Sequence, residues 1–269
     1  MNKSIVIHKK QGETPLEALN AFKRAHSEYK DAVACYAGRL DPMAEGKLLL
    51  LFGEECKKKD RYAALDKEYE VEVLLDVGSD TGDALGLVSY SGHETRVDPG
   101  VLDAALRAER GAHMREYPAF SSKTVNGKQL FLYALEGKLG DIIIPKHEER
   151  VYAITHVGSA MADTAALRVR INAFLAKVPL TDEPSKALGE NFRIDAVRKS
   201  WDALFTAAGE RSFATLRLRV ACGSGTYMRT LAGRLGEALG TKALALSITR
   251  TKIGKRWLGF WLEPGQSMG

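Results

Sequence analysis

Asp41 is the residue of this sequence whose surroundings best suit chemistry. It lies in the segment 36–46, Y-A-G-R-L-D-P-M-A-E-G, just ahead of the apolar run 48–52. Gly38 and Gly46 permit tight turns, and Pro42 fixes the backbone after the acid. Catalytic side chains are often carried by loops on a rigid scaffold, so the carboxylate is a candidate nucleophile or base. The alternative is an Asp that caps a turn, which is the more common role of an arbitrary Asp-Pro pair.

The motif around Asp41 resembles the catalytic loop of the TruB family of tRNA pseudouridine synthases, G-x-L-D-P-x-A-x-G, at every fixed position. The resemblance implies that Asp41 is the catalytic residue. It covers residues 5–155 and 212–256. It further implies an α+β catalytic fold, with a mixed, mostly antiparallel sheet, surrounding helices and an active site in a basic cleft.

A second motif, Lys67-Glu68-Tyr69, matches the family's K-x-Y. The resemblance implies that Tyr69 is a catalytic-site aromatic, and such a ring can stack on a flipped base. Read alone, Tyr69 would be a core or cross-strand aromatic, because it alternates with acidic residues along the predicted strand 66–77.

A third motif, residues 222–231, resembles the family's C-x-x-G-T-Y-I-R-T-L. It implies that Tyr227 packs beside the target base and that Arg229 is a catalytic residue paired with Asp41. Without the resemblance, Arg229 would be interpreted as a solvent-facing helix residue. Ile248 matches the apolar position that lines the uracil pocket in the family.

The remaining predicted substrate contacts lie where the chain follows or departs from the family pattern. Tyr36 and Arg39 replace the family's usual His and Thr, and Tyr36 can still stack in an opened RNA loop. Lys9 begins the counterpart of K-P-x-G-x-T-S, in which the Pro and Ser are replaced. Lys123 lies in a segment that resembles the family's P-x-x-S-A-x-K-x-x-G-x-x-L-Y, with Ser122 where Ala is usual. It could contact phosphate, although an ordinary surface lysine is an equal alternative.

The chemistry implied by the resemblance explains this choice of residues. Making pseudouridine breaks the C1′–N1 bond of a uridine and joins C1′ to C5, with no redox step, so we expect no cofactor and no metal. An Asp with an ordinary pKa of about 3.9 is ionised at neutral pH; burial raises that pKa, and an Arg partner lowers it. We therefore expect Asp41 to need Arg229.

Periodicity predicts the elements that position these residues. Thr14 and Glu17 form a capping box for a helix, and Asp98 begins a second one. A strand over 216–222 runs into a helix ending at Gly240. The stripe Ile194, Val197, Trp201, Leu204 and Phe205 predicts a helix that contacts the core.

Two other kinds of site are excluded by their spacing. The polar turn 78–86 resembles a calcium loop, but the bidentate Glu at the twelfth position is missing. The turn 223–225 fits neither G-x-x-x-x-G-K-[ST] nor G-x-G-x-x-G, so no nucleotide site is predicted there.

Composition sets the broad class. The chain has 269 residues and a net charge of +5, which permits a polyanionic partner without requiring one. The three cysteines are far apart and no stretch reaches membrane-spanning length, so we expect a cytoplasmic protein with no membrane partner. We expect a monomer with one catalytic domain over 1–262, an insertion at about 172–210 and no C-terminal RNA-binding module.

The leading hypothesis is a tRNA pseudouridine synthase that isomerises the T-loop uridine at position 55, with the tRNA T-arm stem-loop as partner. Two alternatives stay open at this point. One is a pseudouridine synthase acting on another RNA. The other is a non-catalytic RNA-binding protein that folds tRNA.

Overall fold

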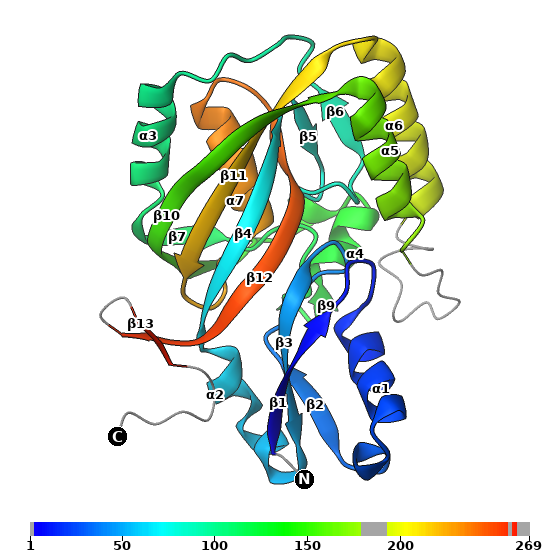
Figure 1. The fold of residues 1–269 in the computed structure, drawn as a ribbon, viewed down its shortest axis with the longest axis vertical. Coiled ribbons are helices and arrows are strands. Elements are labelled where there is room, and N and C mark those ends of the chain that lie inside the picture. The colour runs from blue at the N-terminus through cyan, green and yellow to red at the C-terminus, as the bar shows by residue number, and fades with distance from the viewer. Residues whose placement is uncertain (1–2, 179–192, 258–259, 263–269) are drawn as a thin grey trace.

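A nine-stranded sheet forms the centre of the molecule in the computed structural model, which describes residues 3–178, 193–257 and 260–262 (Figure 1). Its main path runs β1-β3-β12-β4-β11-β10-β7; β2 pairs with β3, and β13 with β12. The bounds are β1 Ser4–Lys9, β2 Ala34–Ala37, β3 Glu45–Phe52, β4 Asp66–Leu75, β7 Gly111–Glu116, β10 Lys146–Asp163, β11 Ser212–Cys222, β12 Ala243–Trp257 and β13 Phe260–Leu262. Among the strands that the structure describes in this sheet, only β3 and β12 pair in parallel. The predicted α+β class is confirmed.

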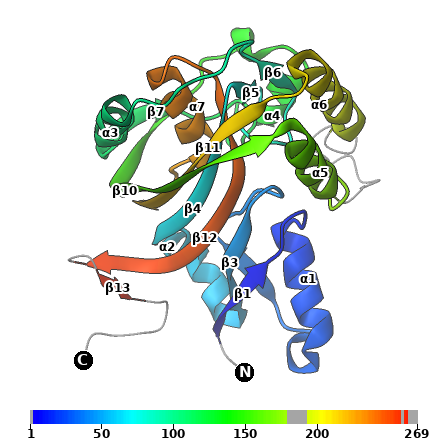
Figure 2. The ribbon, with the colours of Figure 1, turned by 45° about the horizontal axis from the view of Figure 1, so that its top comes forward.

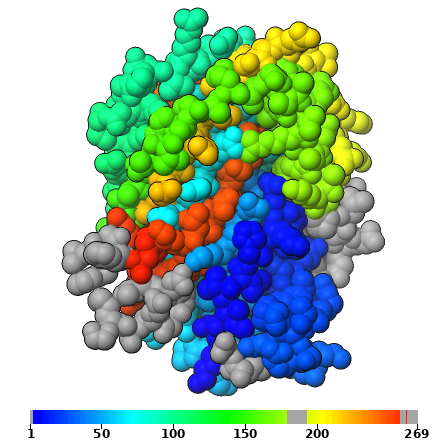
Figure 3. Space-filling model, in the orientation of Figure 1, coloured from blue at the N-terminus to red at the C-terminus, as the bar shows by residue number. Residues whose placement is uncertain are grey.

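The helices gather at two ends of the sheet. They are α1 Pro15–Ala25, α2 Lys59–Ala63, α3 Pro99–Ala108, α4 Leu130–Leu135, α5 Thr164–Leu175, α6 Ile194–Ala208 and α7 Met228–Ala238. Figures 1 and 2 show α1 and α2 beside the N-terminal strands, and α3, α5, α6 and α7 around the opposite end. Figure 3 shows that β12 reaches the surface between these two parts. Two small strand pairs, β5 Val77–Ser79 with β6 Val88–Tyr90 and β8 Thr124–Val125 with β9 Lys128–Gln129, lie outside the main sheet.

Local sequence signals account for most element ends. The predicted capping box is present: the backbone N–H of Glu17 donates to the Thr14 hydroxyl at 3.2 Å, and the Thr14 N–H donates to the Glu17 carboxylate at 2.7 Å. The strand expected over 66–77 is shorter than predicted. Asp76 interrupts it with a φ of 68°, and its buried carboxylate pairs with Arg211 at 2.7 Å and accepts from Thr241.

Helix α6 packs against the main core through the predicted apolar stripe. Ile194, Val197, Trp201, Leu204 and Phe205 are all at least nine-tenths buried. The interpretation of this stripe as core contact is confirmed. Residues 179–192 of the segment predicted as an insertion lie outside the described residues, and the domain organisation stays a prediction. No helix in the described ranges is both long and apolar enough to cross a membrane.

Candidate active site

The loop that carries Asp41 connects β2 to β3 and is held by one backbone hydrogen bond from outside the loop and one within it. The Gly12 N–H donates to the Pro42 carbonyl at 2.8 Å, and the Ala44 N–H donates to the Asp41 carbonyl at 3.0 Å. Gly46, with a φ of 106°, lets β3 approach β12 closely. A Cβ there would lie 2.4 Å from the Arg250 carbonyl oxygen. The parallel pairing of Gly46 with Arg250 therefore requires glycine.

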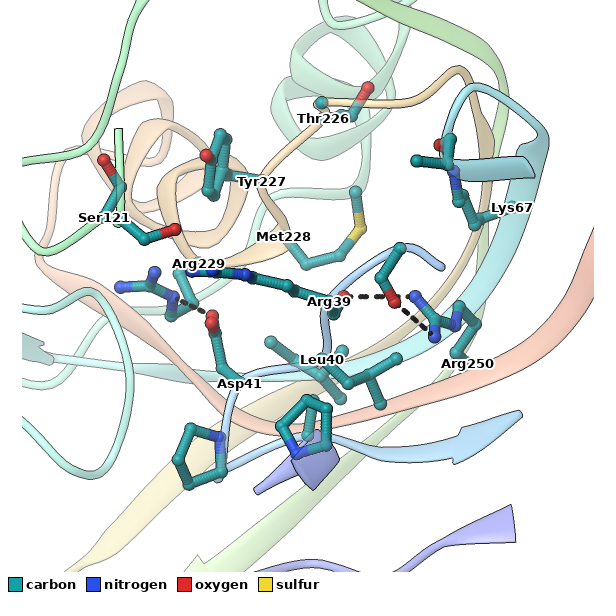
Figure 4. Close-up of a pocket in the computed structure, with 18 of the residues that line it drawn as sticks. Arg39, Leu40, Asp41, Lys67, Ser121, Thr226, Tyr227, Met228, Arg229 and Arg250 are labelled. Carbon is teal, nitrogen blue, oxygen red and sulfur yellow. Dashed lines mark hydrogen bonds and ion pairs between the residues drawn. The ribbon is translucent and has the colours of Figure 1, made fainter. Parts of the chain in front are cut away.

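Asp41 and Arg229 form the predicted ion pair. Arg229 Nε lies 2.8 Å from Asp41 Oδ2, and Figure 4 shows this contact as a dashed line. The Arg229 side chain is 5% exposed, whereas that of Asp41 is 45% exposed. The other guanidinium nitrogens donate to the carbonyls of Thr81 (2.6 Å) and Phe120 (3.1 Å). The pair thus joins a buried, fixed cation to an accessible carboxylate.

A second carboxylate, Asp83, lies behind the pair, with Oδ2 3.6 Å from Arg229 Nε. Burial raises the pKa of Asp83, although the charge of Arg229 opposes the shift. Burial alone would lower the pKa of Arg229, but Asp41 and Asp83 outweigh it and raise that pKa. Arg229 therefore stays charged and presents a fixed hydrogen-bond donor to the Asp41 carboxylate.

Asp41 opens into a cavity of about 550 Å³. The predicted residues that line it with Asp41 and Arg229 are Tyr36, Arg39, Tyr69, Tyr227 and Ile248. They come from β2, the β2–β3 loop, β4, β12 and the start of α7, which are spread over most of the sequence. Figure 4 shows the Asp41 carboxylate, Arg229 and Tyr227 on one side of the cavity and Arg250 and Lys67 on the other. A space of this size can hold one flipped nucleotide.

Two phenols in the wall stay protonated. Burial raises the pKa of Tyr69, and the neighbouring Arg250 only partly opposes this. Burial raises the pKa of Tyr227 to about 12, with the charge of Asp41 acting in the same direction. Both hydroxyls are therefore neutral hydrogen-bond donors at physiological pH, and both rings offer stacking surfaces.

Lys9 does not lie where the sequence prediction places it. Its side chain is fully buried and does not line the cavity. Its ammonium donates to the carbonyls of Lys10 (3.0 Å) and Ala44 (2.5 Å), the latter in the Asp41 loop. Burial lowers its pKa to about 8. The structure therefore corrects the assignment: Lys9 supports the catalytic loop from below and does not contact substrate in this conformation.

Lys123 also lies outside the cavity lining, although Ser121 and Ser122 line it. Its side chain is exposed, and its ammonium sits 5.0 Å from the centre of the Tyr117 ring. Phosphate contact at the rim stays a prediction for this residue.

Sequence reasoning assigned no role in the site to two buried cations at the other end of the cavity, Arg250 and Lys67, although Lys67 stands in the K-x-Y motif. Arg250, 1% exposed, donates to the carbonyls of Lys47 (2.7 Å), Arg39 (3.2 Å) and Gly38 (3.1 Å). Lys67, 5% exposed, lines the same wall, and burial together with Arg250 lowers its pKa to about 8. Strand alternation contained a signal for Arg250, because Ile248, two residues earlier, was predicted to face the pocket.

The site holds one accessible carboxylate, which can act as an acid–base group or a nucleophile, beside aromatic rings on which a flat polar ligand can stack. Among the residues that the structure describes, no group of three or more His, Cys, Asp or Glu could hold a metal ion. The Ser121 hydroxyl is buried at the cavity wall without a hydrogen-bond partner in the described chain, so it is free to meet a ligand.

Fold and site together define an α+β protein with a charged cleft of nucleotide size. The model of the TruB family pseudouridylate synthase N terminal domain matches residues 26–173, more than half of the 269 residues. The chain belongs to the TruB family of pseudouridylate synthases.

Curated relatives support this placement. The chain is 30% identical over 239 residues to a tRNA pseudouridine synthase B of Cupriavidus metallidurans, covering 89% of this chain and 59% of that protein. It is 32% identical over 221 residues to a protein of the same name from Ralstonia nicotianae, covering 82% and 54%. The chain thus spans little more than half the length of these two relatives.

Solved structures show the same fold at lower identity. A chain of a Cbf5–Nop10–Gar1 complex superposes with a TM-score of 0.54, at 16% identity, covering 93% of this chain and 48% of that one. At this identity the likeness concerns the fold alone.

Proposed function

We propose that this protein is a tRNA pseudouridine synthase that isomerises the uridine at position 55 in the T loop of tRNA. The observation that carries the proposal is the Asp41–Arg229 pair, which holds an accessible carboxylate at a nucleotide-sized cavity between two protonated phenols. Relatives named tRNA pseudouridine synthase B, about 30% identical over most of this chain, support tRNA as the substrate.

The reaction needs one carboxylate and careful retention of the base. Asp41 acts at the sugar as nucleophile or base while the C1′–N1 bond breaks. The uracil, kept in the cavity, turns until C5 faces C1′ and the new C–C bond forms. The C5 proton leaves and N1 ends protonated, so the product has the composition of the substrate. No oxidant or external group enters this balance.

In this proposal the residues that line the cavity keep the detached uracil in place. Tyr69 stacks on the flipped ring and Ile248 gives it an apolar edge, while Tyr227 closes the side next to Arg229. Tyr36 and Arg39 line the cavity beside the Asp41 loop, and in this proposal they contact the opened RNA loop. Lys123 at the rim meets a phosphate.

The non-catalytic alternative is less well supported. A protein that only folds tRNA has no need of a buried cation aimed at an accessible carboxylate, because the charge pair adds nothing to phosphate binding. The geometry also pairs Arg229 with two acids, so this end of the cleft is poorly suited to attracting phosphate.

Turnover on an unmodified T-arm stem-loop tests the proposal directly. Because isomerisation leaves the mass unchanged, pseudouridine is detected by a chemical label that reacts with it selectively. We expect labelling at position 55, and none in a stem-loop carrying cytidine there. Mapping of pseudouridine in total RNA, with and without the protein, tests the RNA choice. Sites lost only outside tRNA would favour the alternative substrate.

A further inference from the structure

Helix α6 is fixed to the turn that holds Arg229. This turn, residues 79–88, links β5 to β6 and supplies the Thr81 carbonyl and the Asp83 carboxylate to Arg229. The Trp201 indole N–H donates to the Ala84 carbonyl at 3.1 Å, and the Val88 N–H donates to the Ser200 hydroxyl at 3.2 Å. Trp201, which donates, and Ser200, which accepts, both lie in α6.

Arg193, at the N-terminal end of α6, makes the contact nearest to the site. Its guanidinium pairs with both carboxylate oxygens of Asp80, at 2.7 and 3.2 Å. The same guanidinium lies 4.6 Å from the centre of the Phe120 ring. Phe120 in turn gives its carbonyl to Arg229 at 3.1 Å. Arg193 thus joins two of the segments that together hold the Arg229 guanidinium.

A small cavity of about 50 Å³ shows that Arg193 lies close to the Asp41–Arg229 pair. It lies behind the ion pair, and its lining includes Asp41, Arg229, Phe120 and Arg193. Arg193 adopts a φ of 55°, a conformation that non-glycine residues rarely take. Strain of this kind persists where surrounding contacts hold the residue in place, and in the described part of the chain Arg193 is held by its pair with Asp80 and by the Phe120 ring.

We propose that Arg193 is a positioning residue for the Asp41–Arg229 pair, supplied by a segment beyond the residues 26–173 that match the family model. It acts by clamping the 79–88 turn and Phe120 together behind Arg229. The expected effect of Arg193 on turnover rests on the proposed function. Its contacts with Asp80 and Phe120 do not depend on that function.

Arginine is needed for this role because the contact is both forked and stacked. A planar guanidinium can pair with two carboxylate oxygens while its face lies on an aromatic ring, and a lysine ammonium cannot do both. Loss of the clamp leaves Arg229 its carbonyl partners but lets them move. A misplacement of the order of 1 Å at a catalytic group lowers rates by up to about a hundredfold.

The chain offers a matched control. Arg168 in α5 pairs with Asp202 at 3.2 Å and stacks on Phe205 at 4.7 Å, so it has the same two kinds of contact, with residues that do not line the cavity. The test compares Arg193→Ala, Arg193→Lys and Arg168→Ala in the full chain, with single-turnover rates at saturating T-arm stem-loop, RNA affinity and melting temperature.

We expect both Arg193 variants to lose about tenfold or more in the single-turnover rate, with RNA affinity within about twofold of the parent. Arg168→Ala should keep the parental rate. A rate for either Arg193 variant within about twofold of the parent, or an equal loss in Arg168→Ala, would overturn the proposal.

A measurement without RNA separates this inference from the proposed function. The Nε–H of Arg229 donates to Asp41, so its NMR signal and its exchange with solvent report on the pair itself. We expect Arg193→Ala to shift that signal and speed its exchange at least about tenfold, and Arg168→Ala to leave both unchanged. A parent that forms no pseudouridine would refute the function, and unchanged Arg229 exchange in Arg193→Ala would refute the positioning role.

Discussion

Two buried arginines stand at opposite ends of the cavity and have different partners. Arg229 is 4% exposed and meets two carboxylates, Asp41 at 2.8 Å and Asp83 at 3.6 Å. Arg250 is 1% exposed and, among the described residues, donates to three backbone carbonyls and to no carboxylate. Both cations are buried.

The difference separates a reactive end from a scaffolding end. A guanidinium facing a carboxylate controls the charge and orientation of that acid, which is what a catalytic group requires. A guanidinium facing carbonyls of Gly38, Arg39 and Lys47 fixes the backbone of the Asp41 loop. Removal of the Asp41 carboxylate at the reactive end should therefore lower the reaction rate. Removal of the Arg250 cation at the scaffolding end should lower the stability of the fold.

Asp41→Asn is the strongest test of the reactive end. The amide keeps the shape and one acceptor oxygen for Arg229, but it cannot serve as a carboxylate nucleophile or base. We expect turnover on the T-arm stem-loop to fall at least about a thousandfold. RNA affinity and melting temperature should stay close to the parent, because Arg229 keeps Asp83 and its two carbonyl partners.

Glu70→Gln is the matched control for this change. Glu70 is 50% exposed, close to the 45% of Asp41, and it also pairs with an arginine, Arg219 at 3.1 Å. That pair does not line the cavity, so the control should turn over normally. Turnover of Asp41→Asn within tenfold of the parent would remove Asp41 from the mechanism.

Arg250→Met tests the scaffolding end. It leaves three carbonyls without this donor, and each buried unsatisfied group costs about 1–3 kcal/mol, so we expect the free energy of unfolding to fall by at least about 3 kcal/mol in urea titrations. Arg110→Met is the control, since Arg110 is exposed and donates to one carbonyl, that of Ile154. Equal losses in the two variants would contradict the scaffolding role.

The pH dependence of stability gives a second test of the scaffolding end, through Lys67. Burial and Arg250 hold its folded-state pKa at about 8, below the ordinary 10.5. Between these values the unfolded chain binds more protons, so this lysine makes stability rise with pH from about 8 to 10.5. In Lys67→Met the free energy of unfolding should therefore rise by roughly 3 kcal/mol less than in the parent across this pH range, as measured by unfolding titrations. Lys57→Met, at an exposed lysine, is the matched control for loss of a lysine charge.

The sequence predicted the reactive end far better than the scaffolding end. Asp41, Tyr69, Tyr227 and Arg229 occupy motifs with several fixed positions, so the resemblance placed them in one site although Asp41 and Arg229 are 188 positions apart. The sheet was predictable for a related reason, since apolar and polar residues alternate along β4 and β11.

The scaffolding end depends on tertiary packing that no local pattern contains. Lys9 was predicted to contact substrate, but the crossing of β1 beneath the Asp41 loop buries it completely. Arg193 lies beyond the matched segment, and its role arises where α6 meets the 79–88 turn. The bend at Asp76 was missed because its ion pair with Arg211 spans 135 positions.

Tyr36, a β2 residue in the cavity lining, gives the smallest expected effects. It lines the cavity, its ring faces Lys59 at 5.5 Å, and no described residue hydrogen-bonds to its hydroxyl. If the ring stacks on an RNA base, stacking contributes about 1–3 kcal/mol, so Tyr36→Ala should lose roughly tenfold or more in RNA affinity or rate. Tyr36→Phe keeps the ring and should stay within about twofold of the parent.

Tyr62→Ala separates stacking from packing in this test. Tyr62 packs near Cys35 in the same part of the fold but does not line the cavity, so its loss should lower the melting temperature without a comparable loss of RNA affinity. A Tyr36→Phe variant as impaired as Tyr36→Ala would show that the hydroxyl meets the RNA. Tyr36 would then belong with the hydrogen-bonding groups of the reactive end, and the stacking role would be wrong.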